Sequence, residues 1–229
     1  MTALHVQNLT FSWPGSEEPT LSIADLSLAP GERVFLFGPS GSGKSTLLSA
    51  IAGVVDVAPG AIKVAEQDIG ALQGGARDRF RVDHLGIIFQ VFNLIPWLNA
   101  LENILLPCTY SLRRRERAGR DPAKAARRLL NELGLSDPSQ ASRQANELSV
   151  GQQQRVAAAR ALIGGPEILI ADEPTSSLDT DARERFMTLL FDQATSVGST
   201  LLFVSHDVSL NTRFRRVVDI TELRAEAAA

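Results

Sequence analysis

Four short stretches of this chain are apolar on both sides of an extended backbone and do not alternate between apolar and polar positions. A strand buried on both faces of a parallel sheet needs this pattern, whereas a half-exposed strand alternates with a period of two. We therefore predict four buried parallel strands, at Arg33 to Phe37, Leu85 to Phe89, Glu167 to Ala171 and Thr200 to Ser205.

Between the predicted strands lie helical patterns, notably at Lys44 to Ala52, Gln152 to Ile163 and Asp181 to Val197. Strands that alternate with helices predict an α/β fold, with a parallel core sheet and helices on its faces. The amino-terminal part differs, because Leu4 to Trp13 and Leu21 to Leu28 have the pattern of strands joined by a turn at Pro14-Gly15. We expect these two to form a small antiparallel sheet beside the parallel one.

Strand signals disappear between residues 91 and 147, where helical patterns dominate, most clearly at Leu101 to Leu106 and Pro122 to Leu133. Gly134 follows the second pattern at the position of a helix C-cap. We predict a single domain in which residues 1–90 and 148–223 form the α/β core with its antiparallel part. Residues 91–147 form an inserted helical subdomain, and residues 224–229 form a short tail.

The inserted segment contains a basic run, Arg113-Arg114-Arg115-Glu116-Arg117. A run of like charges is typical of a solvated loop or helix face, which is our interpretation here. A contact with acidic lipid or protein is the alternative.

Composition narrows the class of protein. The chain has 229 residues, of which 44% are hydrophobic and 21% charged, and its net charge of −3 argues against a nucleic-acid surface. One cysteine, Cys108, cannot form an internal disulfide, and we expect it to be buried or half-buried. The start has neither the basic nor the apolar region of a leader peptide, and no apolar run approaches the roughly twenty residues of a membrane span. We expect a cytosolic protein unless a partner holds it elsewhere.

The strongest motif is Gly38-Pro39-Ser40-Gly41-Ser42-Gly43-Lys44-Ser45-Thr46, between a predicted strand and a predicted helix. This order is that of a phosphate-binding loop, in which glycines let backbone N–H groups converge on phosphate oxygens. The following helix directs its positive end at the same oxygens. Lys44 can neutralise phosphate charge, and the Ser45 hydroxyl can complete a Mg²⁺ shell. The motif predicts a nucleoside triphosphate site.

Two acidic residues, Asp172 and Glu173, end a second buried strand. A carboxylate in this position beside a phosphate-binding loop can hold Mg²⁺ directly or through water, which we assign to Asp172. Glu173 projects differently and can act as general base on a water in line with the γ-phosphate. The alternative for Glu173 is a turn charge before Pro174.

The pentapeptide Leu148-Ser149-Val150-Gly151-Gln152 precedes a predicted helix. Ser149 and Gln152 have the spacing of a capping box, while Gly151 leaves the helix start open to a phosphate. This pentapeptide, continued by Gln153-Gln154-Arg155-Val156, resembles the signature sequence of ATP-binding-cassette (ABC) ATPases.

Further motifs of that family appear in the family's order. The resemblance implies that Gln90 senses Mg²⁺ and the attacking water, and that His206 contacts the γ-phosphate. It implies that Ser176-Ser177-Leu178-Asp179 is the D-loop at a dimer interface, with Asp179 in the nucleotide site. Trp13 stands where the family has an aromatic ring stacked on adenine, with Phe11 as the alternative. The implied fold is a phosphate-loop NTPase of ABC type, and the implied activity is ATP hydrolysis with ATP and Mg²⁺.

Two positions depart from the family pattern. Val150 replaces the commoner first glycine of the signature, and Ser177 replaces a commoner alanine in the D-loop. Val150 adds a side chain near the opposing nucleotide, so the affinity of the closed dimer could change. No catalytic residue is missing.

The resemblance also implies a homodimer. In this family the signature segment completes the nucleotide site of a second subunit, and this chain has one of each element. Two copies should therefore pair head to tail around two ATP molecules, with two-fold symmetry. ATP binding would close this dimer, and hydrolysis would release it.

The stretch from Gln90 to Ile104 is similar to ATPases of the bacterial lipoprotein-release and macrolide-exporter branch. Members serve FtsX-like membrane permease subunits whose coupling helix enters a groove near this stretch. Ile95, Pro96, Trp97 and Leu98 are apolar enough to line it, although ordinary core is the alternative for each. The resemblance implies a stand-alone subunit, bound peripherally at the cytoplasmic face of the bacterial inner membrane. The resemblance also implies that this subunit powers export, lipoprotein extraction or mechanical work.

Other members of the superfamily are alternatives. A nucleic-acid-maintenance ATPase would be expected to carry a long coiled coil, zinc cysteines and positive charge. A translation-regulating ATPase would carry two cassettes in one chain. An ATPase of an amino-acid or phosphate importer is closer, and a neighbouring gene for a periplasmic binding protein would favour it. The transported substrate cannot be deduced from this subunit, which it never touches.

Overall fold

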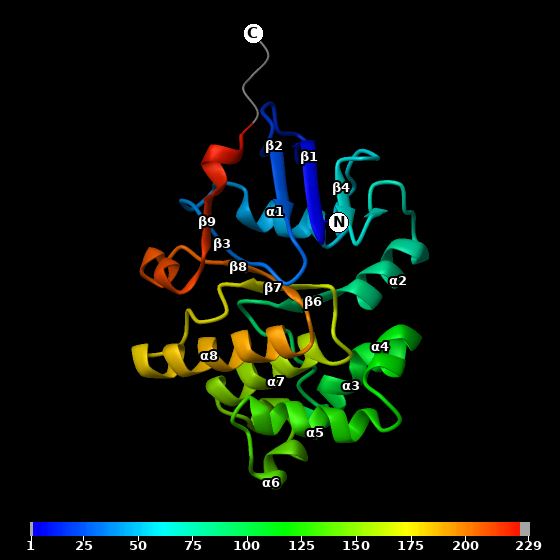
Figure 1. Ribbon diagram of the computed structural model, residues 1–229, viewed down its shortest axis with the longest axis vertical. Helices are drawn as coiled ribbons and strands as arrows, with labels where there is room; N and C mark the ends of the chain where they lie inside the picture. Colours follow the sequence, from blue (N-terminus) through cyan, green and yellow to red (C-terminus); the bar gives the residue numbers. More distant parts are fainter. Residues whose placement is uncertain (1, 225–229) are drawn as a thin grey trace.

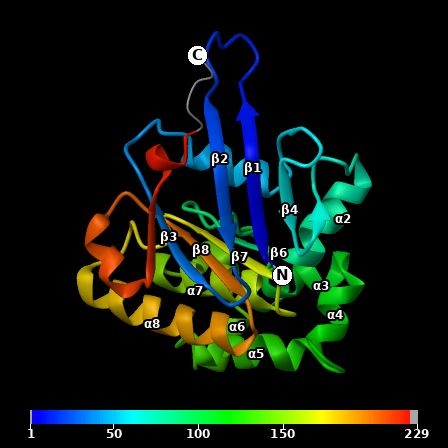
Figure 2. The ribbon, with the colours of Figure 1, turned by 45° about the horizontal axis from the view of Figure 1, so that its top comes forward.

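The computed structural model describes residues 2–224 and centres on a parallel sheet with strand order β6-β7-β8-β3-β9 (Figures 1 and 2). The strands of this sheet are β3 (Arg33–Phe37), β6 (Leu85–Ile88), β7 (Ile168–Asp172), β8 (Thr200–Val204) and β9 (Arg216–Asp219). Every neighbouring pair is parallel, so the carboxyl ends of all five strands meet at one edge. The α/β fold with four buried parallel strands is confirmed, and β9 adds an unpredicted edge strand.

A second, antiparallel sheet has the strand order β2-β1-β4-β5 and stands beside the first (Figure 2). Its strands are β1 (Leu4–Phe11), β2 (Leu21–Leu28), β4 (Ile62–Val64) and β5 (Gln67–Asp68). The predicted pair β1 and β2 is in register from Leu4 opposite Leu28 to Phe11 opposite Leu21. The two short strands β4 and β5 were not predicted.

Helices cover the parallel sheet and fill the segment between β6 and β7. They are α1 (Lys44–Ile51), α2 (Gly75–His84), α3 (Ala100–Tyr110), α4 (Leu112–Arg117), α5 (Pro122–Glu132), α6 (Pro138–Ala141), α7 (Val150–Leu162) and α8 (Thr180–Ser196). Short 3₁₀ turns follow as η1 (Ala145–Glu147), η2 (Val208–Arg213) and η3 (Ile220–Leu223). Of the predicted tail, only residue 224 lies within the described residues.

The two faces of the parallel sheet contribute to two hydrophobic cores, because alternate side chains of a strand point to opposite faces. Val34 and Leu36 of β3 pack with α1 and the antiparallel sheet. Phe35 faces the other way and joins α3, α5, α7 and α8, where it stacks on Phe203 at 6.0 Å between ring centroids. Figure 1 shows this layering, with α7 and α8 under the sheet and α1 above it. The parallel sheet is thus covered on both faces.

The basic run on α4 is a solvated helix face at Arg113, Arg115, Glu116 and Arg117, as predicted, but not at Arg114. Arg114 is 1% exposed, and its guanidinium donates hydrogen bonds to the carbonyl oxygens of Leu85, Ala161 and Ile163. Burial lowers the pKa of Arg114 to about 10. Arg114 departs from the prediction because it lies beside the carboxyl end of α7, where unpaired carbonyl groups need donors.

The flanking arginines of this run are paired as well. Arg113 and Arg117 both contact the Glu167 carboxylate, the latter at 2.8 Å, and His84 lies 3.1 Å from its second oxygen. Burial raises the pKa of Glu167, but the hydrogen bonds from His84 and Arg113 outweigh it and bring the pKa to about 2. The cluster joins α4 to α2 and to the start of β7.

Cys108 is buried in α3 at 6% exposure, as expected. Burial raises the pKa of its thiol. Among residues 2–224, no helix has the length and apolar character needed to cross a membrane.

Candidate functional site

The glycine-rich loop, residues 38–46, connects the carboxyl end of β3 to the start of α1. Gly43 is the N-cap of α1 with a φ of 97°, and a Cβ there would lie 3.1 Å from the Thr20 carbonyl oxygen. No side chain caps this helix, so the N–H groups of its first turn point into the loop. Helix starts of this kind bind anions through free N–H groups and the helix dipole.

Two further groups in the loop fit a bound anion. The Lys44 side chain folds back over the loop. Its ammonium group donates hydrogen bonds to the carbonyl oxygens of Gly38 and Pro39, at 2.7 and 2.9 Å. The Ser42 hydroxyl is buried and has no hydrogen-bond partner within residues 2–224. A positive charge and an unused donor therefore lie in a loop with open N–H groups, which suits phosphate oxygens.

A cleft of about 370 Å³ opens beside the loop at the carboxyl edge of the parallel sheet. Parallel sheets bind ligands at this edge, because loops from several strands converge there. Most of the predicted catalytic and phosphate-binding residues line the cleft, together with Thr20, which was not predicted. The lining residues are Thr20, Ser40, Gly41, Gly43, Lys44, Ser45, Thr46, Gln90, Asp172, Glu173 and His206.

Glu173 follows β7 in a left-handed backbone conformation, with a φ of 47°. A non-glycine residue in this region is strained and needs support from its surroundings. The carboxylate supplies part of that support, since it accepts hydrogen bonds from the His206 backbone N–H, the His206 ring and the Ser205 hydroxyl. Ser205 was not predicted as a site residue, because a serine at a strand end gives no signal until its neighbour is known.

Asp172 lies directly before Glu173, at the end of β7. Burial raises the pKa of Asp172, the Glu173 carboxylate raises it further, and Lys44 offsets part of the rise. A cation near the two carboxylates would offset both the cost of burying the Asp172 charge and its repulsion from Glu173. The oxygen donors in the cleft, namely the carboxylates, the Ser45 hydroxyl and the Gln90 amide, are those that Mg²⁺ prefers.

The signature segment, Leu148 to Gln152, does not line the cleft of its own chain. Ser149 is the N-cap of α7 and forms the predicted capping box, in which its N–H donates to the Gln152 side chain at 2.9 Å. Val150 is 51% exposed, and a Cβ on Gly151 would meet no atom within 4 Å. The start of α7 is therefore open to solvent.

Other predicted residues also lie outside the lining of the cleft. Trp13 is 46% exposed and meets Phe11 edge to face at 5.0 Å. Asp179 caps α8 by accepting a hydrogen bond from the Ala182 N–H at 2.8 Å. The loop residues Gly38, Pro39 and Ser42 belong to the loop without lining the cleft.

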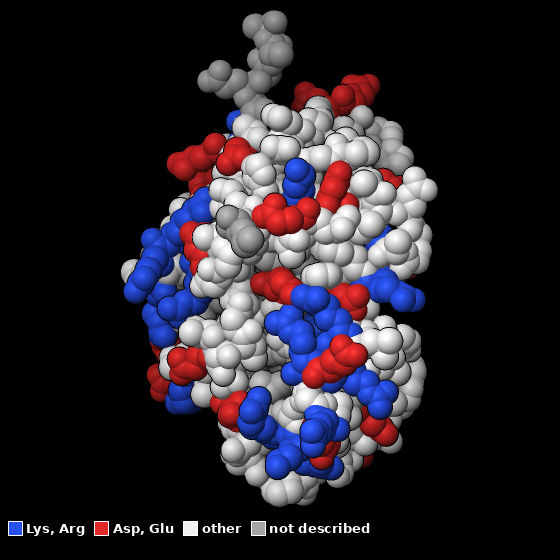
Figure 3. All heavy atoms as spheres, turned by 45° about the vertical axis from the view of Figure 1, so that its right-hand side comes forward, with Lys and Arg blue, Asp and Glu red and all other residues white. Residues whose placement is uncertain are grey.

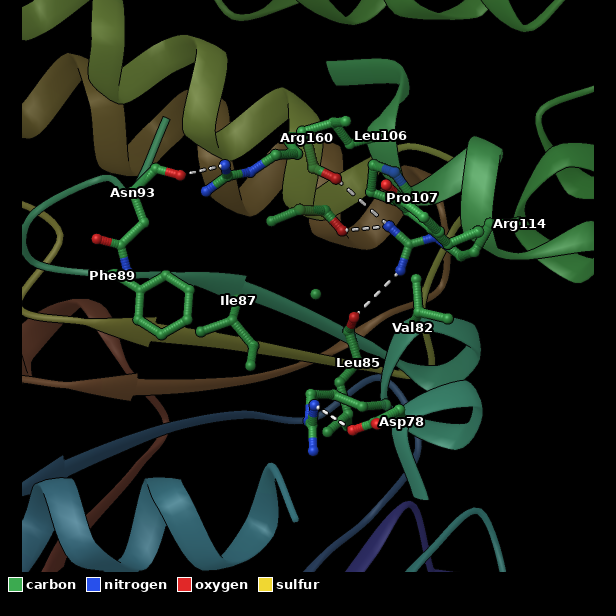
Figure 4. Close-up of a pocket in the computed structure, with 14 residues that line it drawn as sticks. Asp78, Val82, Leu85, Ile87, Phe89, Asn93, Leu106, Pro107, Arg114 and Arg160 are labelled. Atoms are coloured by element: carbon green, nitrogen blue, oxygen red, sulfur yellow. Dashed lines mark hydrogen bonds and ion pairs between the residues drawn. The ribbon is translucent and has the colours of Figure 1, made fainter. Parts of the chain in front are cut away.

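A separate groove of about 350 Å³ lies where α2 and β6 face α3 and α7 (Figure 4). Its walls include the apolar side chains of Phe89, Leu106 and Tyr110, and Tyr110 is 74% exposed.

Lys and Arg side chains gather on the side of the molecule formed by α2 and α4 (Figure 3). Trp97 is 70% exposed, so it is not the core residue that we kept as an alternative.

The sequence profile of the ABC transporter family matches residues 21–176. The chain belongs to the ABC transporter family. This ABC ATPase is 41% identical over 204 residues to the lipoprotein-releasing system ATP-binding protein LolD of Syntrophotalea carbinolica, covering 89% of this chain and 87% of that protein. It is 36% identical over 219 residues to the macrolide export ATP-binding/permease protein MacB of Rhodopseudomonas palustris. That match covers 95% of this chain and 32% of MacB.

Solved structures agree with the family assignment. The dimeric structure of MJ0796, a bacterial ABC transporter cassette, superposes with a TM-score of 0.80 at 35% identity, covering 94% of this chain and 93% of that one. A post-hydrolysis structure of the same cassette, bound to ADP and phosphate, has a TM-score of 0.78 at 33% identity and covers 98% and 97%. The expected ABC fold, the ATPase activity and the resemblance to the LolD and MacB branch are confirmed.

Proposed function

We propose that the cleft binds ATP with Mg²⁺ and that its residues act as the sequence predicts. The loop residues Gly38 to Thr46 hold the phosphates, and Trp13 stacks on the adenine. Ser45, Asp172 and Gln90 hold Mg²⁺, which neutralises phosphate charge when it is bound. The observation that carries this proposal is the convergence of Lys44, Asp172, Glu173, Gln90 and His206 on one cleft from four strand ends.

Glu173 is proposed as the general base for the attacking water. Its carboxylate is held by donors from Ser205 and His206, so its position is fixed before the substrate arrives. The side chain is 12% exposed, which limits competition from bulk water. His206 is 70% exposed at its side chain and is proposed to contact the γ-phosphate.

The nucleotide site is proposed to be completed by a second copy of the chain. Ser149, Gly151, Gln152 and Asp179 lie outside the lining of their own cleft, and the start of α7 is open. Free N–H groups at a helix start are suited to a nucleotide phosphate from another subunit. A two-fold homodimer lets each copy supply these residues to the other, with two nucleotides at the interface.

The groove of Figure 4 is proposed to receive a short helix of an FtsX-like membrane subunit. Its exposed apolar residues include Phe89 and Tyr110, whereas the predicted residues Ile95, Pro96, Trp97 and Leu98 do not line it. The exposed Trp97 is proposed to extend the docking surface beyond the groove. In this proposal the single ABC ATPase domain has its helical subdomain at residues 91–147. The ATPase is bound through its partner at the cytoplasmic face of the inner membrane, and closure of the homodimer drives the partner.

The substitution Glu173→Gln tests the proposal, because glutamine keeps the shape of the side chain but cannot accept the proton. We expect ATP affinity to be retained while turnover falls by about 100-fold or more. Size-exclusion chromatography with ATP and Mg²⁺ should show a shift from monomer to dimer. Glu132→Gln, on the surface of α5, is the matched control. Wild-type turnover in Glu173→Gln would remove Glu173 from catalysis.

A further inference from the structure

Arg160 of α7 binds the chain segment that follows Gln90. Its guanidinium donates a hydrogen bond of 2.6 Å to the carbonyl oxygen of Asn93 (Figure 4) and another of 2.6 Å to that of Phe92. Burial lowers the pKa of Arg160, and no carboxylate within residues 2–224 forms an ion pair with it. The two backbone carbonyls are therefore the acceptors that stabilise this largely buried charge.

The glutamine loop, residues 90–99, joins β6 to α3, and side chains of the two neighbouring helices bind its backbone at two places. Near α3 the buried Asn103 side chain accepts from the Ile95 N–H at 2.8 Å and donates to the Ile95 carbonyl at 3.1 Å. Near Gln90 the side-chain contacts come from Arg160 at Phe92 and Asn93. Phe92 is two residues from Gln90, so at most about 7 Å of chain separates the held carbonyl from the cleft.

The same helix begins within the signature segment, Leu148 to Gln152. Arg160 lies on α7, which begins after Ser149, so roughly 16 Å of helix joins the two. The far end of α7 is fixed by Arg114, which donates to the carbonyl oxygens of Ala161 and Ile163 and also to that of Leu85 in β6. Helix α7 is thus tied to the start of β6 by Arg114 and to the loop after β6 by Arg160.

We propose that Arg160 is a positioning residue that links the signature helix to Gln90. When the start of α7 engages the nucleotide of a second copy, a movement of the helix is passed through Arg160 to the glutamine loop. This adjusts the position of Gln90 within the cleft, which Gln90 already lines in the single chain. The inference rests on the proposed role of Gln90 in the nucleotide site. It adds that Arg160 makes the position of Gln90 depend on dimer closure.

The test compares Arg160→Ala with Arg155→Ala in the full-length chain. Arg155 lies on the same helix and makes the same kind of contact, since it donates to the carbonyl oxygens of Leu133 and Gly134. We expect Arg160→Ala to keep ATP affinity within about twofold of wild type. Its kcat should fall by about fivefold or more, and the Mg²⁺ concentration for half-maximal activity should rise by about fivefold or more. Amide hydrogen exchange of residues 90–95 should also become faster. Arg155→Ala should leave the Mg²⁺ dependence and the exchange of residues 90–95 near wild type.

Two further variants separate the possible outcomes. Arg160→Lys keeps the positive charge and one donor group, so its kcat should lie between those of Arg160→Ala and wild type. It replaces Arg160→Ala in the test if the alanine variant does not fold. In a Gln90→Ala background, Arg160→Ala should cause no further loss of kcat, because the two residues act in one path. Equal changes of the Mg²⁺ dependence and of the exchange in Arg160→Ala and Arg155→Ala, or additive losses of kcat with Gln90→Ala, would overturn the inference. Unchanged kcat and Mg²⁺ dependence in Gln90→Ala alone would instead refute the proposed role of Gln90.

Discussion

The His206 ring nitrogen Nδ1 and the Glu173 carboxylate oxygen Oε1 lie 2.7 Å apart and join the ends of β8 and β7. The His206 backbone N–H binds the same oxygen at 2.8 Å. These two contacts to one carboxylate oxygen orient the His206 ring through Nδ1 and leave Nε2 for a second partner.

His206→Ala should lower turnover by about 10- to 100-fold, because it removes a charge-assisted hydrogen bond to phosphate and one donor to Glu173. Ser205→Ala removes a single neutral donor to the same carboxylate and should cost less than about tenfold. Phosphate release at saturating ATP measures both. If Ser205→Ala is the more damaging of the two, His206 does not act on the phosphate.

Lys44→Ala should weaken ATP binding itself. A charge-assisted phosphate contact contributes about 1.5–3 kcal/mol, which corresponds to about 10- to 100-fold in affinity. Calorimetric titration with ATP gives the dissociation constant, and Lys124→Ala on the exposed start of α5 is the control. Equal affinities in the two variants would contradict the phosphate contact.

Ser149→Arg should bind ATP in each monomer but fail to hydrolyse it, because the new side chain blocks the nucleotide of the second copy. Ser149→Ala removes the helix cap without adding bulk and should retain more activity, which separates the two effects. Mixing Ser149→Arg with Lys44→Ala protein creates a heterodimer in which one composite site has both defects and the other has neither. Partial recovery of phosphate release in the mixture would support shared sites. Wild-type turnover in Ser149→Arg alone would exclude them.

Trp97→Glu should weaken binding to the membrane partner with little effect on folding, since the side chain is 70% exposed. The charge would be placed at an apolar interface, where burial of an unpaired polar group costs several kcal/mol. Co-purification with the FtsX-like subunit measures binding, while basal phosphate release should stay near wild type. Val217→Glu, at the opposite edge of the parallel sheet, is an exposed apolar control. Unchanged co-purification of Trp97→Glu would remove this residue from the docking surface.

The cluster around Glu167 predicts a pH dependence of stability. The pKa of about 2 in the folded chain lies below the ordinary value of 4.5, so the stabilisation is present above pH 4.5 and is lost as the pH falls towards 2. Its size is on the order of 2 kcal/mol after allowing for solvent around the half-exposed Arg113 and Arg117. Urea unfolding should show Glu167→Gln less stable than wild type at pH 7, with the difference narrowing at pH 3. A constant difference would contradict this origin.

The sequence predicts those parts of the fold that depend on local pattern. The strand at Arg33 to Phe37 has the same bounds in the structure as in the prediction, because a continuous apolar run and the glycine-rich loop delimit it. Strand β9 was missed because its side chains are mostly half-exposed and no apolar run marks it. Its place is determined by pairing with β3, a contact between residues about 180 positions apart.

The candidate site shows the same limit. The glycine-rich loop, Asp172 and Glu173 were found because each follows an apolar strand, so the sequence alone places them at one edge of the sheet. The links between them were not predictable, because they are tertiary contacts. The bond from Ser205 to Glu173 and the bonds from Arg160 to the glutamine loop join residues that have no shared sequence pattern. The buried Arg114 was misjudged for the same reason.

The single cysteine of the chain makes it a ready scaffold for thiol-specific labels. Cys108 is buried at 6% exposure, and burial raises the pKa of its thiol, so little reactive thiolate is present at neutral pH. A cysteine placed at the exposed Val150 would react far faster than the native one. Spin labels or fluorophores at that position, without removal of Cys108, would report the distance between two copies as ATP binds and as phosphate leaves.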